Sequence, residues 1–366
     1  MGASHARGGV TRRRLLQSLP ALAMMPMASR VFAQSAQSTP TIRVRGINHV
    51  TLSVSDVKRS VDFYQGLFGM PVTSRQGMAT NLRIGAGPQF LGVTSAGTTS
   101  PRINHICLGV DDFNVDRLTA ILGQRGITTS DASGSAAGGL DGGPMRMRVR
   151  RRGPDAGGAT EGTPEVYFSD PDGVVVQLQD PRYCGGGGAL GNVCPPPEAS
   201  PKKGLLPLRD WSHCTIFGSD GVRANAFYQG LFGLRVQAYQ GPTAPALGVG
   251  GVQFLMFAGG GGRGRRGGAD AAGAPAGSIN HLCMNMDGFN PDAVIKALES
   301  YGIKPRGSVQ GPAGPLVHYI SLRMENRGGA REGTPELYFT DPDGLLIQLQ
   351  DAKYCGGAGV LGDICL

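Results

Sequence analysis

The sequence EGTPEVYFSDPDGVVVQLQD, Glu161–Asp180, returns almost unchanged as EGTPELYFTDPDGLLIQLQD, Glu332–Asp351. The two copies differ only by Val–Leu, Val–Ile and Ser–Thr exchanges. A match of this quality indicates an internal duplication. The chain is therefore expected to contain one architecture twice.

Each copy of the repeat is predicted to be a β-hairpin. A β-rich run ends in Tyr-Phe, Asp-Pro-Asp-Gly reverses the chain, and an apolar run leads into Gln-Leu-Gln. Because strand side chains alternate between faces, Gln177 and Gln179 share one face with Val175, and the remaining apolar residues take the other. Gln177 and its counterpart Gln348 are thus amides inside apolar runs, which suggests that they bind something.

The segments around the hairpins repeat as well. Phe-Tyr-Gln-Gly-Leu-Phe-Gly stands at both Phe63–Gly69 and Phe227–Gly233 and is typical of a helix that ends at glycine. A strand pattern that contains a histidine begins the same order of elements four times along the chain. This repetition predicts an α+β fold of four βαβββ units in two modules. The predicted domains are a signal peptide (1–33), a linker (34–44), a first module (45–194), a second linker (195–208) and a second module (209–366).

The first module illustrates the expected elements. Ser55-Asp56 is predicted to cap a helix that ends at Gly69, and Asp112 or Asn114 to cap a second helix that ends at Gly126. Glycine-rich loops are expected over 131–143 and, in the second module, 258–277. The predicted strands of the first module are 43–54, 70–75, 80–84, 89–94, 102–110, 145–149, 164–168 and 174–179.

The N-terminus resembles a twin-arginine export signal. Thr11–Gln17 reads TRRRLLQ, the apolar run Ala21–Met27 follows, and Val-Phe-Ala offers a cleavage site after Ala33. The mature protein is therefore predicted to be periplasmic or otherwise extracytoplasmic; a disordered basic tail is the alternative. No uninterrupted apolar run is long enough for a stable membrane span.

Composition points to small-molecule partners rather than nucleic acid. Removing residues 1–33 takes away five arginines and no acidic residue, so the formal net charge falls from +8 to +3. No basic stripe with interleaved aromatic residues remains. The basic run Arg146–Arg152 is interpreted as a solvated edge strand, with a binding patch as the alternative. Both a monomer and a homo-oligomer are compatible with the sequence.

The seven cysteines fall into two classes. Four of them form a repeated frame in which each pair follows a tyrosine and encloses nine residues, which predicts one disulfide in each module of an exported protein. The other three lie in strand-like runs and are expected to be small buried hydrophobic residues. The predicted disulfides are Cys184–Cys194 and Cys355–Cys365, and the predicted free thiols are Cys107, Cys214 and Cys283.

Four histidines stand at matched strand positions, one in each unit. Three occur in Ile-Asn-His and the fourth in Trp-Ser-His, and equivalent placement in all four units favours a functional cluster over scattered core histidines. These histidines are His49, His105, His213 and His281.

The four units, the FYQGLFG helix ends and the YF-(S/T)-DPDG turns together resemble the vicinal oxygen chelate superfamily. The resemblance covers residues 45–183 and 209–354. The superfamily includes glyoxalase I, extradiol dioxygenases, fosfomycin-resistance enzymes and bleomycin-binding proteins. It implies that each module is a cupped, mixed β-sheet with its helices outside.

The resemblance also implies a metal site in each cup, on the first strand of each unit and on the last strand. The implied ligands are His49, His105 and Gln177 in module one, and His213, His281 and Gln348 in module two. The usual residue at the last position is Glu, and the fourth ligand of glyoxalase I would fall near Gly92 and Met256. A divalent transition metal is expected, with Fe(II) favoured and Mn, Ni or Zn as alternatives. In the competing interpretation the glutamines only hydrogen-bond the histidines of an empty cup.

The leading functional hypothesis is an extradiol-type dioxygenase, because the two-module chain and Tyr167 and Tyr338 match that family's pattern. The histidine that such enzymes carry shortly before this tyrosine is replaced here by Gly-Thr-Pro. His318 has no histidine counterpart in module one, where Met147 aligns, and is proposed as an acid/base or else a surface imidazole. A glyoxalase-like lyase or isomerase and a non-enzymatic, bleomycin-resistance-type binding protein are the alternatives.

Overall fold

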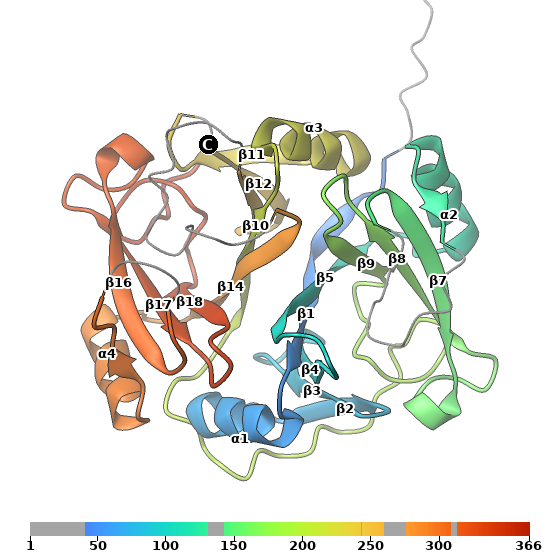
Figure 1. Ribbon diagram of the computed structural model, residues 1–366, viewed down its shortest axis with the longest axis horizontal. Coiled ribbons are helices and arrows are strands. Elements are labelled where there is room, and N and C mark those ends of the chain that lie inside the picture. The colour runs from blue at the N-terminus through green and yellow to red at the C-terminus, as the bar shows by residue number, and fades with distance from the viewer. Residues whose placement is uncertain (1–40, 131–142, 243, 260–275, 309–312) are drawn as a thin grey trace, which may run out of the picture. The chain divides into compact units, whose positions relative to one another are not determined.

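The computed structural model describes residues 41–130, 143–242, 244–259, 276–308 and 313–366 (Figure 1). The predicted signal peptide, most of the first linker and most of both glycine-rich loops lie outside these ranges. The described residues form two nine-stranded mixed sheets, one for each half of the chain, with four α-helices. The predicted α+β fold of two tandem modules is therefore confirmed.

Module one has the strand order β2-β3-β4-β1-β5-β9-β8-β7-β6. Its last hairpin, β8–β9, is the first copy of the repeated stretch. Its elements are β1 (Val44–Val54), α1 (Val57–Phe68), β2 (Val72–Gln76), β3 (Ala79–Arg83), β4 (Phe90–Ser95), β5 (Arg102–Val110), α2 (Val115–Gln124), β6 (Thr128–Thr129), β7 (Arg146–Arg152), a 3-10 turn (Pro154–Ala156), β8 (Thr163–Ser169) and β9 (Val175–Gln179).

Module two repeats this order as β11-β12-β13-β10-β14-β18-β17-β16-β15. The second copy of the repeated stretch forms the hairpin β17–β18. Its elements are β10 (Asp210–Phe217), α3 (Gly221–Phe232), β11 (Arg235–Tyr239), β12 (Pro245–Gly250), β13 (Gln253–Ala258), β14 (Ser278–Met286), α4 (Pro291–Ser300), β15 (Lys304–Pro305), β16 (Val317–Arg323), a 3-10 turn (Glu325–Arg327), β17 (Thr334–Thr340) and β18 (Leu346–Asp351).

Local sequence chemistry sets the helix limits. The Asp56 carboxylate accepts a hydrogen bond from the Arg59 amide and caps α1, and Gly69 ends the helix in the left-handed conformation at φ 69°. Asp220 and Gly233 do the same for α3. Because a residue with a Cβ is strained at this φ, glycine is required where the chain leaves each helix.

The central strands of each sheet bring the histidines together. In module one β1 and β5 are antiparallel neighbours, with Thr51 opposite His105, and β9 runs parallel to β5 with Gln177 opposite Cys107. Val176 and Leu178 enter the hydrophobic core. Gln177 and Gln179 therefore face the other side, as the alternation of the sequence predicts.

The two-residue strands β6 and β15 were not predicted, because two residues carry no periodic pattern. They pair in parallel with β7 and β16. The basic strand β7 lies next to this edge, yet Arg152 at its end is only 1% exposed. The interpretation of the basic run as a solvated edge is thus wrong for Arg152.

The cysteine pairs are joined as predicted. Cys184–Cys194 and Cys355–Cys365 are disulfides, and each closes a loop that follows the last strand of its module. The three other cysteines are buried free thiols. None of the helices in the described part of the chain has the length and apolar character needed to span a membrane.

The two modules contact each other through a reciprocal exchange of hydrogen bonds. The Tyr64 hydroxyl on α1 donates to Asp341 in the β17–β18 turn over 3.1 Å, and the Tyr228 hydroxyl on α3 donates to Asp170 in the β8–β9 turn over 3.2 Å. In Figure 1 α3 lies at the top and α1 at the bottom of the junction between the two halves. Each module's first helix thus fixes the closing turn of the other module.

Candidate metal centre

In module one three side chains from neighbouring strands meet at one point inside the cup. The Gln177 Oε1 atom lies 3.1 Å from His49 Nε2 and 3.1 Å from His105 Nε2. All three side chains are nearly inaccessible to solvent, with Gln177 only 1% exposed. The residues implied by the resemblance are therefore brought together by β1, β5 and β9.

Module two places its equivalent residues together in a looser arrangement. His213 Nε2 and His281 Nε2 are 3.4 Å apart. The buried Gln348 amide makes no hydrogen bond of normal geometry among the described residues, although it lies close enough to both imidazoles to raise their pKa. Buried polar groups are nearly always paired, so this amide is an unusual feature that a bound group would satisfy.

The neighbouring asparagines determine which ring nitrogen carries hydrogen. Asn48 Oδ1 lies 2.8 Å from His49 Nδ1, and the Asn48 amide nitrogen donates to the Tyr183 carbonyl, which orients the amide. Asn104 and Asn280 hold His105 and His281 in the same way. An amide oxygen only accepts, so Nδ1 carries the hydrogen and Nε2 offers its lone pair to the centre of the cup.

The histidines are neutral in the folded protein. Burial lowers the pKa of His105 and of His281 to about 4. Burial first, and then the neighbouring imidazole, lowers the pKa of His49 and His213 well below the ordinary value. Uncharged imidazoles with free Nε2 lone pairs are the form that binds a metal ion.

These residues fit a divalent transition metal. In module one two nitrogen lone pairs and an amide oxygen face one another with no hydrogen between them, which a cation would relieve. Among the described residues no group of three His, Cys, Asp or Glu side chains could hold a metal, because the third donor here is an amide. The opposite orientation of the Gln177 amide would instead donate to both imidazoles, which is the arrangement of an empty cup.

A buried ion-pair network supports this centre and was not predicted. Arg152 Nε donates to Glu165 Oε1 over 2.8 Å, and the Tyr183 and Tyr167 hydroxyls donate to the same carboxylate over 2.7 and 3.2 Å. The Tyr167 ring meets His105 edge-on at 5.5 Å. Glu165 lies within the repeated stretch, so its recurrence as Glu336 was the available signal.

Module two contains the same network. Arg323 Nε donates to Glu336 Oε1 over 2.8 Å, and the Tyr354 and Tyr338 hydroxyls donate to that carboxylate over 3.2 and 3.4 Å. The Tyr338 ring lies 5.4 Å from His281. Both predicted catalytic tyrosines are therefore beside the centres, with burial raising the pKa of each well above 10.

His318 is not among the residues that the cup brings together. Its Nε2 lies 3.3 Å from Glu299 on α4, and it pairs on the sheet with the core residue Phe339. The side chain is 5% exposed. Since side chains alternate along β16, Tyr319 faces the cup and His318 faces the helix.

Module one has no ligand near Gly92, where the fourth ligand of glyoxalase I would fall. A Cβ atom at Gly92 would lie 2.7 Å from the Thr51 hydroxyl, so no larger side chain fits there without moving that threonine. A ligand side chain at position 92 would therefore have to displace Thr51.

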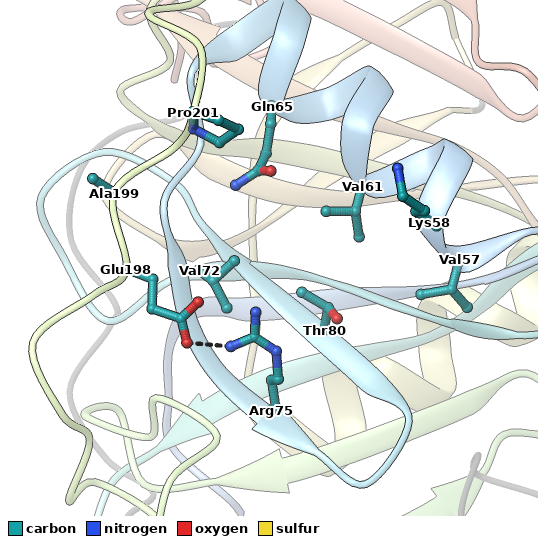
Figure 2. Close-up of a pocket in the computed structure, with 10 residues that line it drawn as sticks. All are labelled: Val57, Lys58, Val61, Gln65, Val72, Arg75, Thr80, Glu198, Ala199 and Pro201. Atoms are coloured by element: carbon teal, nitrogen blue, oxygen red, sulfur yellow. Dashed lines mark hydrogen bonds and ion pairs between the residues drawn. The ribbon is translucent and has the colours of Figure 1, made fainter.

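A surface cleft lies elsewhere, between α1, β2 and β3 and the linker that joins the modules. Figure 2 shows Val57 and Val61 of α1 facing the cleft, with the exposed ion pair of Arg75 and Glu198 at its edge. It contains none of the histidines or glutamines described above. The candidate metal centres are thus enclosed sites, separate from this cleft.

Comparison with protein families matches residues 46–178 to the Glyoxalase/Bleomycin resistance protein/Dioxygenase superfamily. That span includes the whole ligand set of module one. Module one therefore matches the model of this superfamily. Module two lies outside the matched span and has the same strand order as module one.

Solved structures with this superfamily fold cover most of the chain. The 2,3-dioxygenase LapB from Pseudomonas sp. KL28 is 14% identical over 85% of this chain and 93% of its own, with a TM-score of 0.53. Homoprotocatechuate 2,3-dioxygenase from Arthrobacter globiformis is 16% identical over 85% and 81%, with a TM-score of 0.54. An Mn(II)-bound glyoxalase from Novosphingobium aromaticivorans is 16% identical over 84% and 82%, with a TM-score of 0.52.

No curated protein matched the chain. At 14–16% identity the structural similarity establishes the shared fold. One superfamily fold hosts several reactions, so the reaction has to be argued from the site itself.

Proposed function

We propose that the protein is an exported, metal-dependent enzyme of the vicinal oxygen chelate superfamily that acts on a small oxygen-rich substrate, in the manner of an extradiol dioxygenase. The observation that carries the proposal is the meeting of His49 Nε2, His105 Nε2 and Gln177 Oε1 in a buried cup. Fe(II) is the favoured metal, with Mn, Ni or Zn as alternatives, since two imidazoles and one oxygen donor suit these ions.

The bound ion would supply Lewis acidity toward neighbouring substrate oxygens, or a site for O₂. His49, His105 and Gln177 would hold it, and in module two His213, His281 and Gln348. Because all six donors are neutral, the full charge of the ion remains available to attract an anionic chelating substrate.

The surrounding aromatic residues exclude water from the centre. Phe90 stacks on His49 with ring centroids 4.3 Å apart, and Tyr183 covers the same imidazole at 5.6 Å. Tyr167 keeps its proton at neutral pH because burial raises its pKa, and it donates that proton to Glu165, so its hydroxyl oxygen would accept a hydrogen bond from a substrate hydroxyl near His105. Glu165 orients that hydroxyl.

Two alternatives differ in chemistry. A glyoxalase-like lyase or isomerase is disfavoured because Gly92 supplies no fourth ligand and a larger residue there would clash with Thr51. A small-molecule binding protein without metal is favoured if the Gln177 amide donates to both histidines rather than facing them with its oxygen.

Export rests on the twin-arginine pattern and is supported by the two disulfides, which persist mainly in oxidising compartments. Replacing Arg12 and Arg13 with lysine should leave the precursor in the cytoplasm. Cell fractionation measures the export, and normal export of that variant would contradict the proposal.

The decisive experiment is anaerobic loading with Fe(II), Mn(II), Ni(II) or Zn(II), followed by native mass spectrometry and then oxygen consumption with catechol. We expect up to one ion in each module and oxygen uptake by the Fe(II) form. Metal uptake without oxygen consumption would favour the lyase alternative. If no metal binds to wild type or to variants with Glu at 177 or 348, the enzyme hypothesis falls and the binding protein stands.

A further inference from the structure

The two cups differ on one strand. Strand β7 of module one reads RMRVRRR, whereas β16 of module two reads VHYISLR. Arg148 pairs with Tyr167 and Arg150 with Glu165, while the equivalent pairs in module two are Tyr319 with Tyr338 and Ser321 with Glu336. Two guanidinium groups in module one therefore correspond to a phenol and a hydroxyl in module two.

The arginines face the cup. Directly paired residues on neighbouring antiparallel strands point to the same face, and Tyr167 faces His105. Arg150 Nη1 lies 3.5 Å from Glu165 Oε2, with the Arg150 side chain 19% exposed. Arg148 and Arg150 therefore line the same side of the sheet as the candidate metal centre.

The charge on this face differs between the modules. On β7, β8 and β9 the positions that face the cup carry four arginines and one acidic residue, Glu165, so their formal charges sum to +3. The equivalent positions on β16, β17 and β18 carry Arg323 against Glu336, a formal charge of zero. Arg306 directly follows β15 of module two and is not one of these strand positions. Its guanidinium lies over the Tyr319 ring, and that ring stacks on Tyr338 with ring centroids 5.1 Å apart.

A second observation points to a ligand in the charged cup. The Gln177 side chain is buried, its oxygen faces the histidines, and its amide nitrogen has no acceptor among the described residues. Neighbouring strands lie about 4.8 Å apart, so the Arg148 backbone is roughly 10 Å from that of Gln177, two strands away. Chelating oxygens at the centre and an anionic group near Arg148 would suit one small molecule.

We propose that Arg148 and Arg150 form an anion subsite, so that module one takes an oxygen-chelating substrate that also carries a carboxylate. Module two, with Tyr319 and Ser321 at these positions, takes an uncharged aromatic one. The proposal rests on the proposed function, because it assumes that the chelating oxygens sit at the metal centre. The guanidinium groups would bind the carboxylate by charge-assisted hydrogen bonds.

The test compares 3,4-dihydroxybenzoate with catechol, which differ by one carboxylate, by calorimetric titration of the Zn(II)-loaded full chain. His281→Ala isolates module one and His105→Ala isolates module two. In the first background we expect dihydroxybenzoate to bind at least about tenfold more tightly than catechol, since hydrogen bonds to charged groups are worth that factor or more. In the second background we expect no such preference.

Exchanging residues between the repeats provides matched variants. R148Y/R150S should remove the preference from module one, and Y319R/S321R should transfer it to module two. Each exchange installs residues that the other repeat already accommodates, and circular dichroism checks folding. R148K/R150K keeps the charge and should retain part of the preference.

Failure of this proposal and failure of the proposed function give different results. Metal content is measured on the same samples. Full zinc occupancy with equal affinity for both probes, before and after the exchange, would overturn the anion subsite alone. If no zinc binds but dihydroxybenzoate is still preferred in an arginine-dependent way, the metal-enzyme hypothesis is wrong and the anion subsite stands.

Discussion

The cups of the two modules have the same candidate ligands and different surroundings. Gln177 lies 3.1 Å from both of its histidines, whereas Gln348 makes no hydrogen bond of normal geometry among the described residues, and the Nε2 atoms of its histidines are 3.4 Å apart. His49 is held by Asn48, whereas the equivalent His213 is held by Ser212 at 3.1 Å. The two repeats therefore share the central donors, while the groups that orient those donors have diverged.

The largest effect is expected from removing one imidazole. His105→Ala should abolish metal binding in module one only, and His281→Ala in module two only, because each centre draws all its donors from its own sheet. Native mass spectrometry after metal loading would show a loss of one ion per chain in either variant. Loss of both ions from a single substitution would mean that the two centres are not independent.

The next effect concerns the buried aspartates of the closing turns. Burial raises the pKa of Asp170 and of Asp341 from 3.8 to about 6. The folded state therefore binds these protons more tightly than the unfolded state. The resulting stabilisation of the fold is fully present below pH 3.8 and is lost as the pH rises through 6. At pH 7 each carboxylate costs on the order of 3 kcal/mol of the free energy of unfolding.

Asp170→Asn and Asp341→Asn remove that charge and keep an oxygen for the backbone amides of the turn. We expect each variant to gain stability over wild type at pH 7 and to lose the advantage at pH 4, in thermal unfolding followed by circular dichroism. The two variants should behave alike, because the turns are equivalent. A difference from wild type that is the same at every pH would contradict the charge argument.

A smaller effect should follow from restoring the usual carboxylate. Gln177→Glu and Gln348→Glu add a negative charge beside the ion and should tighten metal binding by roughly tenfold or more. We expect the greater gain in module two, where the glutamine makes the weaker contacts with its histidines. Competition with a metal chelator measures the affinity, and unchanged or weaker retention would show that these side chains do not reach the metal.

The smallest effect should come from exchanging the groups behind the first histidines. Asn48→Ser should weaken, and Ser212→Asn should strengthen, metal binding in the respective module by up to about tenfold, because groups that orient a ligand histidine typically change affinity on this scale. The same chelator competition reads both variants. We expect the two substitutions to change metal affinity in opposite directions. A change in the same direction would show that the asparagine is not an orienting group.

Much of the fold followed from the sequence because local signals were strong. The repeated hairpins, the Asp56 cap and the glycine at Gly69 each have a short-range physical cause, and the structure shows all of them. The meeting of His49, His105 and Gln177 was predicted through the resemblance, since contacts between distant strands have no local signature.

The remaining features depend on register, which the sequence alone does not give. The ion pair of Arg152 with Glu165 joins neighbouring strands, and neither residue alone signals burial. His318 was expected near the site, but one position along β16 decides between the cup and α4. The Tyr64–Asp341 contact links residues far apart in sequence, and no periodic pattern predicts it.

The crossed hydrogen bonds of Tyr64 to Asp341 and Tyr228 to Asp170 make the chain equivalent to a dimer whose two subunits have been joined. In a true homodimer each substitution would occur on both sides of the two-fold axis. In the joined chain one half can change without the other, while the crossed contacts continue to hold the halves together. Fusion is the feature that allows Arg148 in one cup and Tyr319 in the other, so that a single folded protein offers two different environments.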